Sequence, residues 1–376
     1  MKVMGTVLAL GTLAATTALP AMAGSEYDGF AAQHAVFVMT NDANSNEVIA
    51  YERMPNGTLH SPHKYSTGGR GSGGTVDPLG SQGSLTLSDD REFLFATNAG
   101  SGTVSVFRVI GSHLVLTDKV ASGGSEPNAV AQHGNLVYVM NTAGSSSLVG
   151  FHLHEGKLTP VADSLRFLSA NFVNSGSVAF SKDGRYLVVT ERATNSIDVF
   201  RVRADGRLSA ITVNPAVGRG TFAAIFSPNG AVIVSETGGP GPNSSTISSY
   251  AIQTDNKLLA ISPAVPTLGA ANCWNAVTPD GRFVYASNAG TSSISGFAIG
   301  ANGALTALPG TVVGLNPSGA TNLDIAISAD GAFLYSLNAA GGSVGIFQIE
   351  HDGSLTNFGI QGGLPAAAGL NGIAAN

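Results

Sequence analysis

The sequence is poor in cysteine, tryptophan and charge. Its 376 residues include one Cys and one Trp, and Asp, Glu, Lys and Arg together make up 11% of the chain. A typical soluble domain carries roughly 25% charged residues. The single cysteine, Cys273, excludes a disulfide framework within the chain. Beyond the N-terminal residues no uninterrupted apolar run is long enough for a membrane-spanning helix, so the low charge does not indicate a membrane protein.

Glycine, in contrast, is abundant. The chain contains 49 Gly, and 43% of its residues are hydrophobic. The hydrophobic content can build a core and argues against disorder, whereas the glycine content argues against an all-helical protein because Gly weakens helix interiors. The formal net charge of −6, without a basic block, argues against nucleic acid or an anionic membrane surface as a partner. These features favour a large, turn-rich β protein.

The first residues have the pattern of a secretory signal peptide. A positive charge precedes a short apolar stretch, and Ala21 and Ala23 occupy the small-residue positions that a signal peptidase reads. We predict cleavage before Gly24, a signal peptide over residues 1–23, and a secreted or periplasmic protein formed by residues 24–376. An N-terminal membrane anchor is the alternative, which the shortness of the apolar stretch disfavours. After cleavage we expect no membrane association.

One unit is repeated seven times along the chain. In each copy a short apolar run ends in Asn or Glu, and the copies recur about every 50 residues. Turn signals such as Pro228-Asn229-Gly230 precede these runs. Each unit predicts four short strands, A to D, which is the pattern of a β-propeller blade. The residues that end the second strands are Asn41, Asn98, Asn141, Glu191, Glu236, Asn288 and Asn338.

The C-terminus is predicted to close the ring. The first unit begins at His34 with its second strand and lacks an A strand of its own. Residues 370–374 resemble the A strands of other units, so we expect them to complete blade 1 and remove the exposed sheet edges. The predicted fold class is all-β, a seven-bladed β-propeller of four-stranded antiparallel blades. We expect one domain and a monomer.

Two glutamates are the first candidates for catalysis. Propellers bind ligands at the mouth of the central channel, where we expect the seven strand-ending residues to lie. The five Asn have a structural explanation, because Asn bonds turn backbones and accepts left-handed dihedral angles. Glu191 and Glu236 have no such advantage, and two neighbouring carboxylates can act as an acid and a base because each raises the pKa of the other. The alternative is a pair of exposed carboxylates, or carboxylates paired with Arg192 or Arg219.

Two further segments are predicted to reach the same mouth. Residues 80–83 contain Gln82, and residues 272–275 contain Trp274 beside Cys273. An aromatic ring at this place can stack on a ligand or plug the channel, and both alternatives stay open. Cys273 is expected to be a buried apolar group rather than a nucleophile.

The sequence predicts no metal and no cofactor. His152 and His154 share one face of a predicted strand, but a zinc site needs three or four ligands. His113, His133 and His351 fall at hairpin turns without evident partners. The glycine pattern at 69–74 matches a dinucleotide fingerprint, but no helix follows to hold a pyrophosphate.

Three segments carry a resemblance to a known family. They are TPDGRFVYASN at 278–288, GSQGS at 80–84 and TERATNSID at 190–198. Through them the chain resembles the lactonase-type seven-bladed propeller family, which includes 6-phosphogluconolactonase and the fungal carboxymuconate cyclase. The resemblance covers nearly all of the chain after residue 23 and is strongest to secreted bacterial members.

The resemblance implies only part of that family's catalytic site. The Glu expected at the end of the fourth blade's B strand matches Glu191. The Arg-His pair expected before that blade's A strand is replaced by Gly176 and Ser177, and an Arg expected in the sixth blade is replaced by Ala289. Those cations would hold a phosphate or carboxylate and stabilise the oxyanion of lactone opening. A neutral lactone is therefore favoured over a phosphorylated one.

Two hypotheses for function follow. In the first, the protein is a lactone hydrolase or related cyclase that acts on a small neutral ring, with Glu191, Glu236 and Arg219 as catalytic residues. The residues assigned to substrate binding are Trp274, Gln82, Asn98, Asn288 and Arg192. In the second hypothesis, the propeller keeps the fold without the chemistry and binds a ligand or a protein partner.

Overall fold

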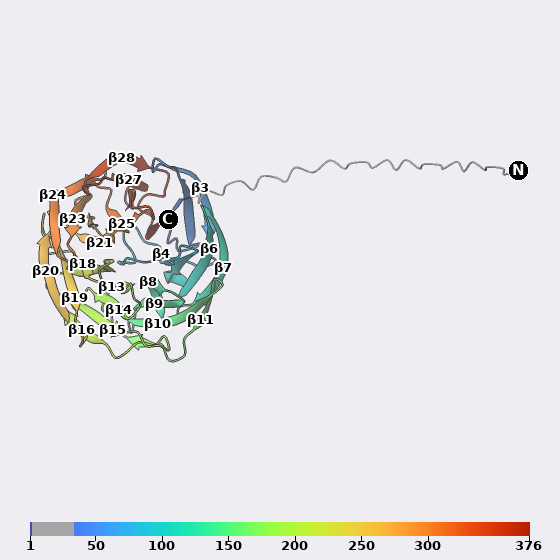
Figure 1. The fold of residues 1–376 in the computed structure, drawn as a ribbon, viewed down its shortest axis with the longest axis horizontal. Helices are drawn as coiled ribbons and strands as arrows, with labels where there is room; N and C mark the ends of the chain where they lie inside the picture. The colour runs from blue at the N-terminus through green and yellow to red at the C-terminus, as the bar shows by residue number, and fades with distance from the viewer. Residues whose placement is uncertain (2–33) are drawn as a thin grey trace. The chain divides into compact units, whose positions relative to one another are not determined.

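Seven antiparallel sheets surround a central axis in the computed structural model, which describes Met1 and residues 34–376. Figure 1 shows the sheets arranged as the blades of a ring. The prediction of an all-β, seven-bladed propeller is confirmed. Apart from Met1, the predicted signal peptide lies outside the described residues. Among these residues no helix is long and apolar enough to cross a membrane.

Each of blades 1 to 3 runs from an innermost strand, A, to an outermost strand, D. Blade 1 consists of β29 (Ile373–Ala375), β1 (Ala35–Met39), β2 (Glu47–Arg53) and β3 (Leu59–Ser66). Blade 2 consists of β4 (Leu85–Leu87), β5 (Phe93–Asn98), β6 (Thr103–Ile110) and β7 (His113–Ala121), with the short 3-10 helix η1 (Ala99–Ser101) after β5. Blade 3 consists of β8 (Ser125–His133), β9 (Leu136–Ala143), β10 (Ser147–His154), β11 (Lys157–Pro160) and β12 (Arg166–Phe167).

Blades 4 to 7 have four strands each. Blade 4 consists of β13 (Ser175–Phe180), β14 (Tyr186–Glu191), β15 (Ser196–Arg201) and β16 (Thr212–Pro215). Blade 5 consists of β17 (Thr221–Phe226), β18 (Val232–Glu236), β19 (Thr246–Ile252) and β20 (Leu258–Pro266). Blade 6 consists of β21 (Asn272–Val277), β22 (Phe283–Asn288), β23 (Ser293–Ile299) and β24 (Leu305–Leu315). Blade 7 consists of β25 (Asn322–Ile327), β26 (Phe333–Asn338), β27 (Ser343–Ile349) and β28 (Leu355–Gln361).

The ring closes as the sequence predicts. Strand β29 pairs antiparallel with β1, and the partners include Phe37 with Ala374 and Val38 with Ile373. In Figure 1 the C-terminus lies near the axis, whereas D strands such as β7, β20 and β28 lie at the rim. Blade 3 differs from the others because β11 and β12 both pair with β10 and share its outer edge.

The blades hold together through apolar contacts between neighbouring sheets. The B strands β5 (FLFATN) and β26 (FLYSLN) are buried along their whole length. One cluster joins Phe95 and Val106 of blade 2 to Val137 and Phe151 of blade 3. Because both faces of a blade pack against other blades, few positions need a charged side chain, which explains the low charge of the sequence.

The turns between A and B strands explain part of the glycine content. In blade 6 the N–H of Gly281 donates to the carbonyl of Thr278 at 2.8 Å, and Gly281 has a φ of +73°. A side chain at this backbone conformation would be strained, so the turn favours Gly. We call the end of the channel that carries these turns the A–B end, and the opposite end, with the B–C turns and D–A loops, the B–C end.

Candidate functional site

The seven residues that end the B strands are fully buried. They are Asn41, Asn98, Asn141, Glu191, Glu236, Asn288 and Asn338. The amide of Asn98 donates to the hydroxyls of Thr103 and Ser105, and the amide of Asn288 donates to those of Ser293 and Ser295. The structure therefore places both amides within their own blades, where they stabilise the B–C hairpin. Their assignment to substrate binding stays a prediction.

Glu191 is held by donors at the edge of blade 4. Its carboxylate accepts hydrogen bonds from the N–H of Ser169 at 2.8 Å, from the Ser169 hydroxyl and from the hydroxyl of Thr194. The carboxyl group of Asp198 lies beside it, and neither Asp198 oxygen has a hydrogen-bond partner among residues 34–376. Burial raises the pKa of Glu191, but the neighbouring Asp198 carboxyl group and the hydrogen bonds from Ser169 and Thr194 outweigh burial and hold it below its usual value.

Asp198 is therefore the carboxyl group whose pKa is coupled to that of Glu191. Burial raises the pKa of Asp198 to about 9, and the neighbouring Glu191 carboxylate adds to the shift. Asp198 therefore keeps its proton at neutral pH beside the ionised Glu191. The sequence predicts that Glu236 is the second carboxyl group beside Glu191. In the structure the carboxyl group beside Glu191 is instead that of Asp198, on the next strand of the same blade.

Glu236 occupies the equivalent place in blade 5. Its carboxylate accepts the N–H of Gly218 at 2.9 Å, the hydroxyl of Ser248 at 2.7 Å and the hydroxyl of Thr246. Burial raises the pKa of Glu236, and these hydrogen bonds oppose the rise. Arg219 lies exposed on the loop that enters blade 5 and forms no ion pair within the described part of the chain. The three residues predicted as catalytic are thus not gathered around one open surface.

A segment of the D–A loop between β3 and β4 closes the B–C end of the channel. The indole N–H of Trp274 donates to the carbonyl of Ser81 at 3.0 Å, and the Ser81 hydroxyl donates to the carbonyl of Asn128. The side chain of Gln82 exchanges two hydrogen bonds of 3.0 Å with the backbone of Asn275. This segment from blade 2 is bonded to blades 3 and 6, and Trp274 is 1% exposed. Trp274 and this segment together are called the plug below, and the assignment of Trp274 to ligand stacking stays a prediction.

Arg192 covers the plug from blade 4. Its guanidinium group lies 4.6 Å from the ring centre of Phe222, which is 4.9 Å from the ring centre of Trp274. It also donates to the carbonyl of Gly80 at 3.2 Å. Burial raises the pKa of the nearby Asp77 to about 6, although the Arg192 charge lowers it. Trp274, Gln82 and Arg192 are thus brought together as predicted, whereas Asp77 and Phe222 carried no sequence signal for this cluster.

The main cavity on the channel axis lies on the other side of this plug. It has a volume of about 720 Å³, and Gln82 contributes to its wall. The rest of the wall is formed by the last residues of β4, β8, β13 and β17 and by the turns that follow these strands. The cavity therefore opens at the A–B end. A second cavity of about 380 Å³ shares Gln82 and Arg91 with it and continues along β25 and β29. The sequence predicts the ligand site at the B–C end, but the open space lies at the opposite end, because the D–A loop fills the predicted mouth.

A contact between a histidine and a carboxylate joins two blades at the wall of the larger cavity. The Nδ1 atom of His133 lies 3.2 Å from a carboxylate oxygen of Asp89. The same oxygen accepts the N–H of Gly134 at 3.2 Å, and the N–H of Asp89 donates to the side chain of Gln132 at 2.8 Å. Sequence reasoning left His133 without a partner. The partner comes from the A–B turn of the preceding blade, which no local pattern reveals.

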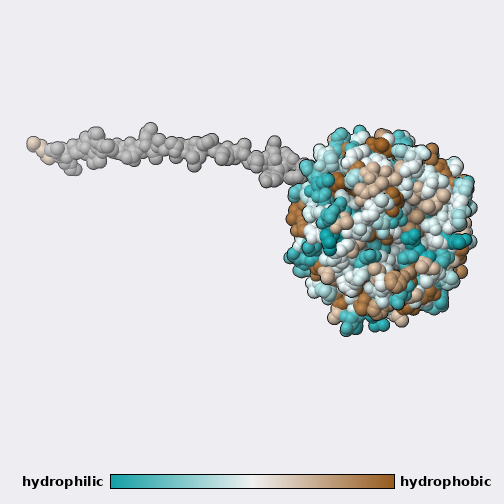
Figure 2. Space-filling view, turned by 180° about the vertical axis from the view of Figure 1, so that it is seen from behind, coloured by the Kyte–Doolittle hydropathy of each residue, from teal (hydrophilic) through white to brown (hydrophobic). Residues whose placement is uncertain are grey.

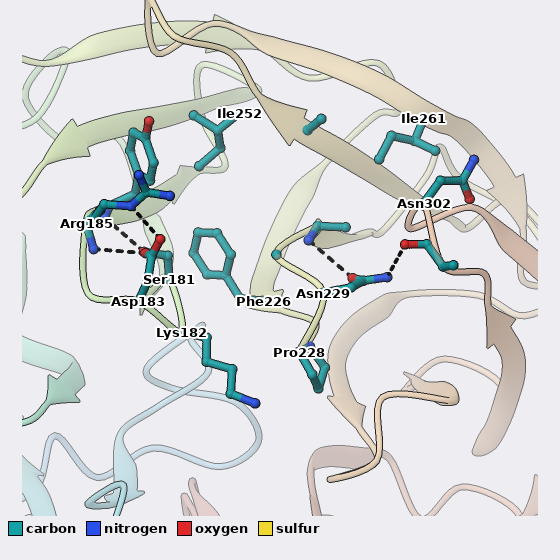
Figure 3. Close-up of a pocket in the computed structure, with 15 residues that line it drawn as sticks. Ser181, Lys182, Asp183, Arg185, Phe226, Pro228, Asn229, Ile252, Ile261 and Asn302 are labelled. Atoms are coloured by element: carbon teal, nitrogen blue, oxygen red, sulfur yellow. Dashed lines mark hydrogen bonds and ion pairs between the residues drawn. The ribbon is translucent and has the colours of Figure 1, made fainter.

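A further pocket of about 550 Å³ lies between blades 4 and 5, away from the axis. Figure 3 shows the ring of Phe226 between the ion pair of Asp183 and Arg185 and the side chain of Asn229. The Arg185 Nε lies 2.5 Å from Asp183, and Asn229 donates to the carbonyls of Gly300 and Ala301. Apart from Lys182, which also lines the channel cavity, the labelled charged and amide groups are paired with protein atoms, so this pocket is a weaker candidate for chemistry than the channel cavity.

Neither a metal centre in residues 34–376 nor a broad apolar patch on the face shown in Figure 2 competes with the channel cavity. Residues 34–376 contain no group of three or more His, Cys, Asp or Glu side chains arranged to hold a metal ion. On the face shown in Figure 2, hydrophilic and hydrophobic residues are interspersed instead of forming one broad apolar patch. The recessed channel is therefore the candidate site.

Solved structures share this architecture. The chain is similar to a candidate 6-phosphogluconolactonase from Bacteroides uniformis, with a TM-score of 0.70 and 20% identity over 92% of this chain and 100% of the other. A candidate 6-phosphogluconolactonase from Bacteroides fragilis has a TM-score of 0.66 and 18% identity over 93% and 99% of the two chains. The periplasmic gluconolactonase of Pseudomonas aeruginosa has a TM-score of 0.66 and 18% identity over 90% and 98%. At these identities the likeness shows the fold alone.

The family follows from the sequence match. The comparison with curated proteins found no match. Three overlapping segments, residues 14–175, 168–274 and 221–322, match the family described as "Lactonase, 7-bladed beta-propeller". Together they cover most of the chain, so this protein belongs to the lactonase family of seven-bladed β-propellers.

Proposed function

We propose that this protein is a lactonase that acts outside the cytoplasm, binding a small cyclic ester in its central channel and opening the ring with water. The observation that carries the proposal is the cavity of about 720 Å³ on the propeller axis. Its volume falls within the range of roughly 300–1,000 Å³ that is typical of small-molecule sites. Family membership supports the reaction class, and the sequence pattern of a signal peptide supports export.

A neutral ring is the substrate class that fits the residues present. Gly176, Ser177 and Ala289 stand where the family resemblance implies Arg and His, so the cations that the resemblance implies for gripping a phosphate are missing. The periplasmic gluconolactonase of Pseudomonas aeruginosa offers a precedent by name for a non-phosphorylated sugar lactone. A gluconolactone-like ring is therefore the first compound to test.

In the sequence-based hypothesis Glu191 is the general base and Glu236 adjusts the pKa of Glu191. Arg219 stabilises the negative charge that develops on the substrate. The test is a panel of neutral and phosphorylated lactones, with acid release measured for the wild type and for Glu191→Gln. A loss of about 100-fold or more in kcat/KM is the effect expected from removing a general base. Activity that survives Glu191→Gln would remove this residue from the mechanism.

A non-catalytic ligand-binding propeller is the second candidate. It is favoured by the full burial of Glu191 and Glu236, whose carboxylates are satisfied by hydroxyl and amide donors. This function predicts that no lactone in the panel is hydrolysed, while one or more of them, or their ring-opened acids, raise the thermal unfolding temperature of the protein. Turnover of any lactone above the uncatalysed rate would exclude it.

A further inference from the structure

The imidazole ring of His133 is fixed between the A–B turns of two other blades. On one side its Nδ1 contacts the Asp89 carboxylate of blade 2 at 3.2 Å. On another side the edge formed by Cδ2 and Nε2 packs beside Gly184 of blade 4, where an added Cβ would lie 2.3 Å from Cδ2 and 2.6 Å from Nε2. The ring of Phe180 lies 6.1 Å away, centre to centre. Contacts from three directions leave the ring one orientation.

The same ring remains accessible from the cavity. The His133 side chain is 35% exposed and lines the cavity of about 720 Å³. Within residues 34–376 neither ring nitrogen forms a hydrogen bond, but Nδ1 lies 3.2 Å from a carboxylate oxygen of Asp89. A carboxylate on Nδ1 favours the tautomer that carries the proton there and leaves Nε2 with a free lone pair. A water molecule that reaches Nε2 from the cavity side, past Gly184, can give it a proton.

Two cations line the same cavity without an ion-pair partner among the described residues. They are Arg91, on the A–B turn of blade 2, and Lys182, on that of blade 4. Both side chains are exposed, so their charges are available to a ligand in the cavity. A cation near a carbonyl stabilises the negative charge that develops when water attacks it. The same cations would hold the carboxylate of a ring-opened product.

We propose that His133 is the general base of lactone hydrolysis at the A–B end of the channel, with Asp89 as its positioning residue. The inference rests on the proposed lactonase function and deepens it by moving the chemistry to the opposite end from Glu191. The substrate class is a lactone that opens to a hydroxycarboxylate able to contact Arg91 and Lys182.

The reaction balances without a metal or redox partner. His133 Nε2 takes one proton from a water molecule as the water oxygen bonds to the lactone carbonyl carbon, and the carbonyl electron pair moves to its oxygen. Collapse of this tetrahedral intermediate re-forms the carbonyl and breaks the bond between the acyl carbon and the ring oxygen. The ring oxygen takes the proton from the His133 imidazolium, which returns the histidine to its neutral form. The hydroxy acid then loses its carboxyl proton to solvent.

Glu191 is a weaker candidate for the general base because its carboxylate is buried. Its carboxylate is not exposed, and three donors from Ser169 and Thr194 occupy its oxygens. A general base must reach the proton that it removes, directly or through one water. His133 meets this condition in the cavity, whereas Glu191 would first have to exchange its protein partners for water.

The experiment compares His133→Ala with His154→Gln on the lactone that the wild type hydrolyses fastest. His154 is an exposed strand histidine of blade 3 and serves as the matched control. We expect kcat to fall about 100-fold or more in His133→Ala, with added imidazole recovering part of it, and no change in His154→Gln. Asp89→Asn should lower kcat more than it changes KM, and Asp89→Glu should restore part of the activity. Unfolding curves of each variant establish that the fold is retained.

The outcomes separate the inference from the proposed function. If the wild type hydrolyses a lactone and folded His133→Ala keeps its kcat, His133 is not the base and only the inference fails. If His133→Ala is inactive but imidazole recovers nothing while Glu191→Gln is equally inactive, the assignment returns to Glu191. If the wild type hydrolyses none of the panel, the proposed function fails and the inference fails with it.

Discussion

The indole N–H of Trp274 donates to the carbonyl oxygen of Ser81 at 3.0 Å, and this bond joins blade 6 to the D–A loop of blade 2. Phe222 of blade 5 packs against the same indole, with ring centres 4.9 Å apart. One buried side chain therefore connects three blades at the closed end of the channel. The stability of the ring and the position of the cavity both depend on it.

Replacing Trp274 by Ala is expected to destabilise the protein by roughly 3–5 kcal/mol, because it removes a large buried ring and leaves a cavity. Ser81 would also lose the donor to its carbonyl. Urea unfolding monitored by circular dichroism measures the change. Phe172→Ala is the control, because Phe172 is 67% exposed and its loss should change the free energy of unfolding by less than about 1 kcal/mol. Equal effects of the two substitutions would contradict the plug.

Asp198 is expected to make the fold sensitive to high pH. Its pKa rises from an ordinary value of 3.8 to about 9 in the folded state, first through burial and then through Glu191. The unfolded chain releases this proton at lower pH than the folded chain, so the stabilisation is complete below the ordinary value and is lost as the pH rises toward about 9. Urea unfolding at a series of pH values measures this loss.

Asp198→Asn is the variant that isolates the effect. Asn resembles the protonated acid but cannot ionise. The free energy of unfolding of Asp198→Asn should therefore increase relative to that of the wild type as the pH rises. Asp205→Asn is the control, because Asp205 is exposed and its pKa is lowered instead, chiefly by hydrogen bonds with Arg207. Wild-type and Asp198→Asn curves that stay parallel across the pH series would show that Asp198 is ionised in the fold.

Gly218 is required by the buried carboxylate of Glu236. A Cβ at this position would lie 1.7 Å from the Glu236 Oε2, and the Gly218 N–H donates to Oε1. Gly218→Ala should therefore cost roughly 1–3 kcal/mol, as overpacking of a filled site usually does. The matched control is Gly362→Ala, since an added Cβ there meets no atom within 4 Å. Thermal unfolding compares the stability of the two variants. If Gly218→Ala unfolds at the same temperature as the wild type, the Glu236 carboxylate can move aside.

Removing residues 373–376 is expected to open the ring. The deletion takes away β29 and leaves β1 with an unpaired edge. Unpaired strand edges promote association between chains, so the truncated protein should elute as larger species in size-exclusion chromatography and unfold at a lower temperature. Ile373→Ala keeps the strand and should remain monomeric while losing some stability. A truncated protein that stays monomeric with unchanged unfolding would contradict closure by β29.

Much of the fold was predictable because its signals are local. Each blade is encoded by its own apolar runs and turn residues, such as Pro279-Asp280-Gly281 before β22. The short stretch at the C-terminus resembled the missing A strand of blade 1, and β29 pairs with β1 as predicted. Blade 3 was less predictable, because the division of its outer strand into β11 and β12 left no clear mark in the repeat.

The candidate site was only partly predictable. The segment with Gln82, the segment with Trp274, and Arg192 converge as expected, since their positions in the repeat place them at one end of the channel. What repeat position cannot reveal is the direction of a side chain within its blade. Glu191 and Glu236 end their strands where predicted, but both carboxylates turn into the blade and are bonded there.

By itself, the sequence determined the number of blades, the closing strand and the family, because these depend on patterns within about 50 residues of chain. The packing of the blades determines which end of the channel is filled and which histidine lies beside a carboxylate. Asp89 and His133 belong to different blades, and the loop with Ser81 meets Trp274 only across the axis. Such contacts depend on how separate repeats pack around a common centre, and the pattern of any one repeat does not contain that information.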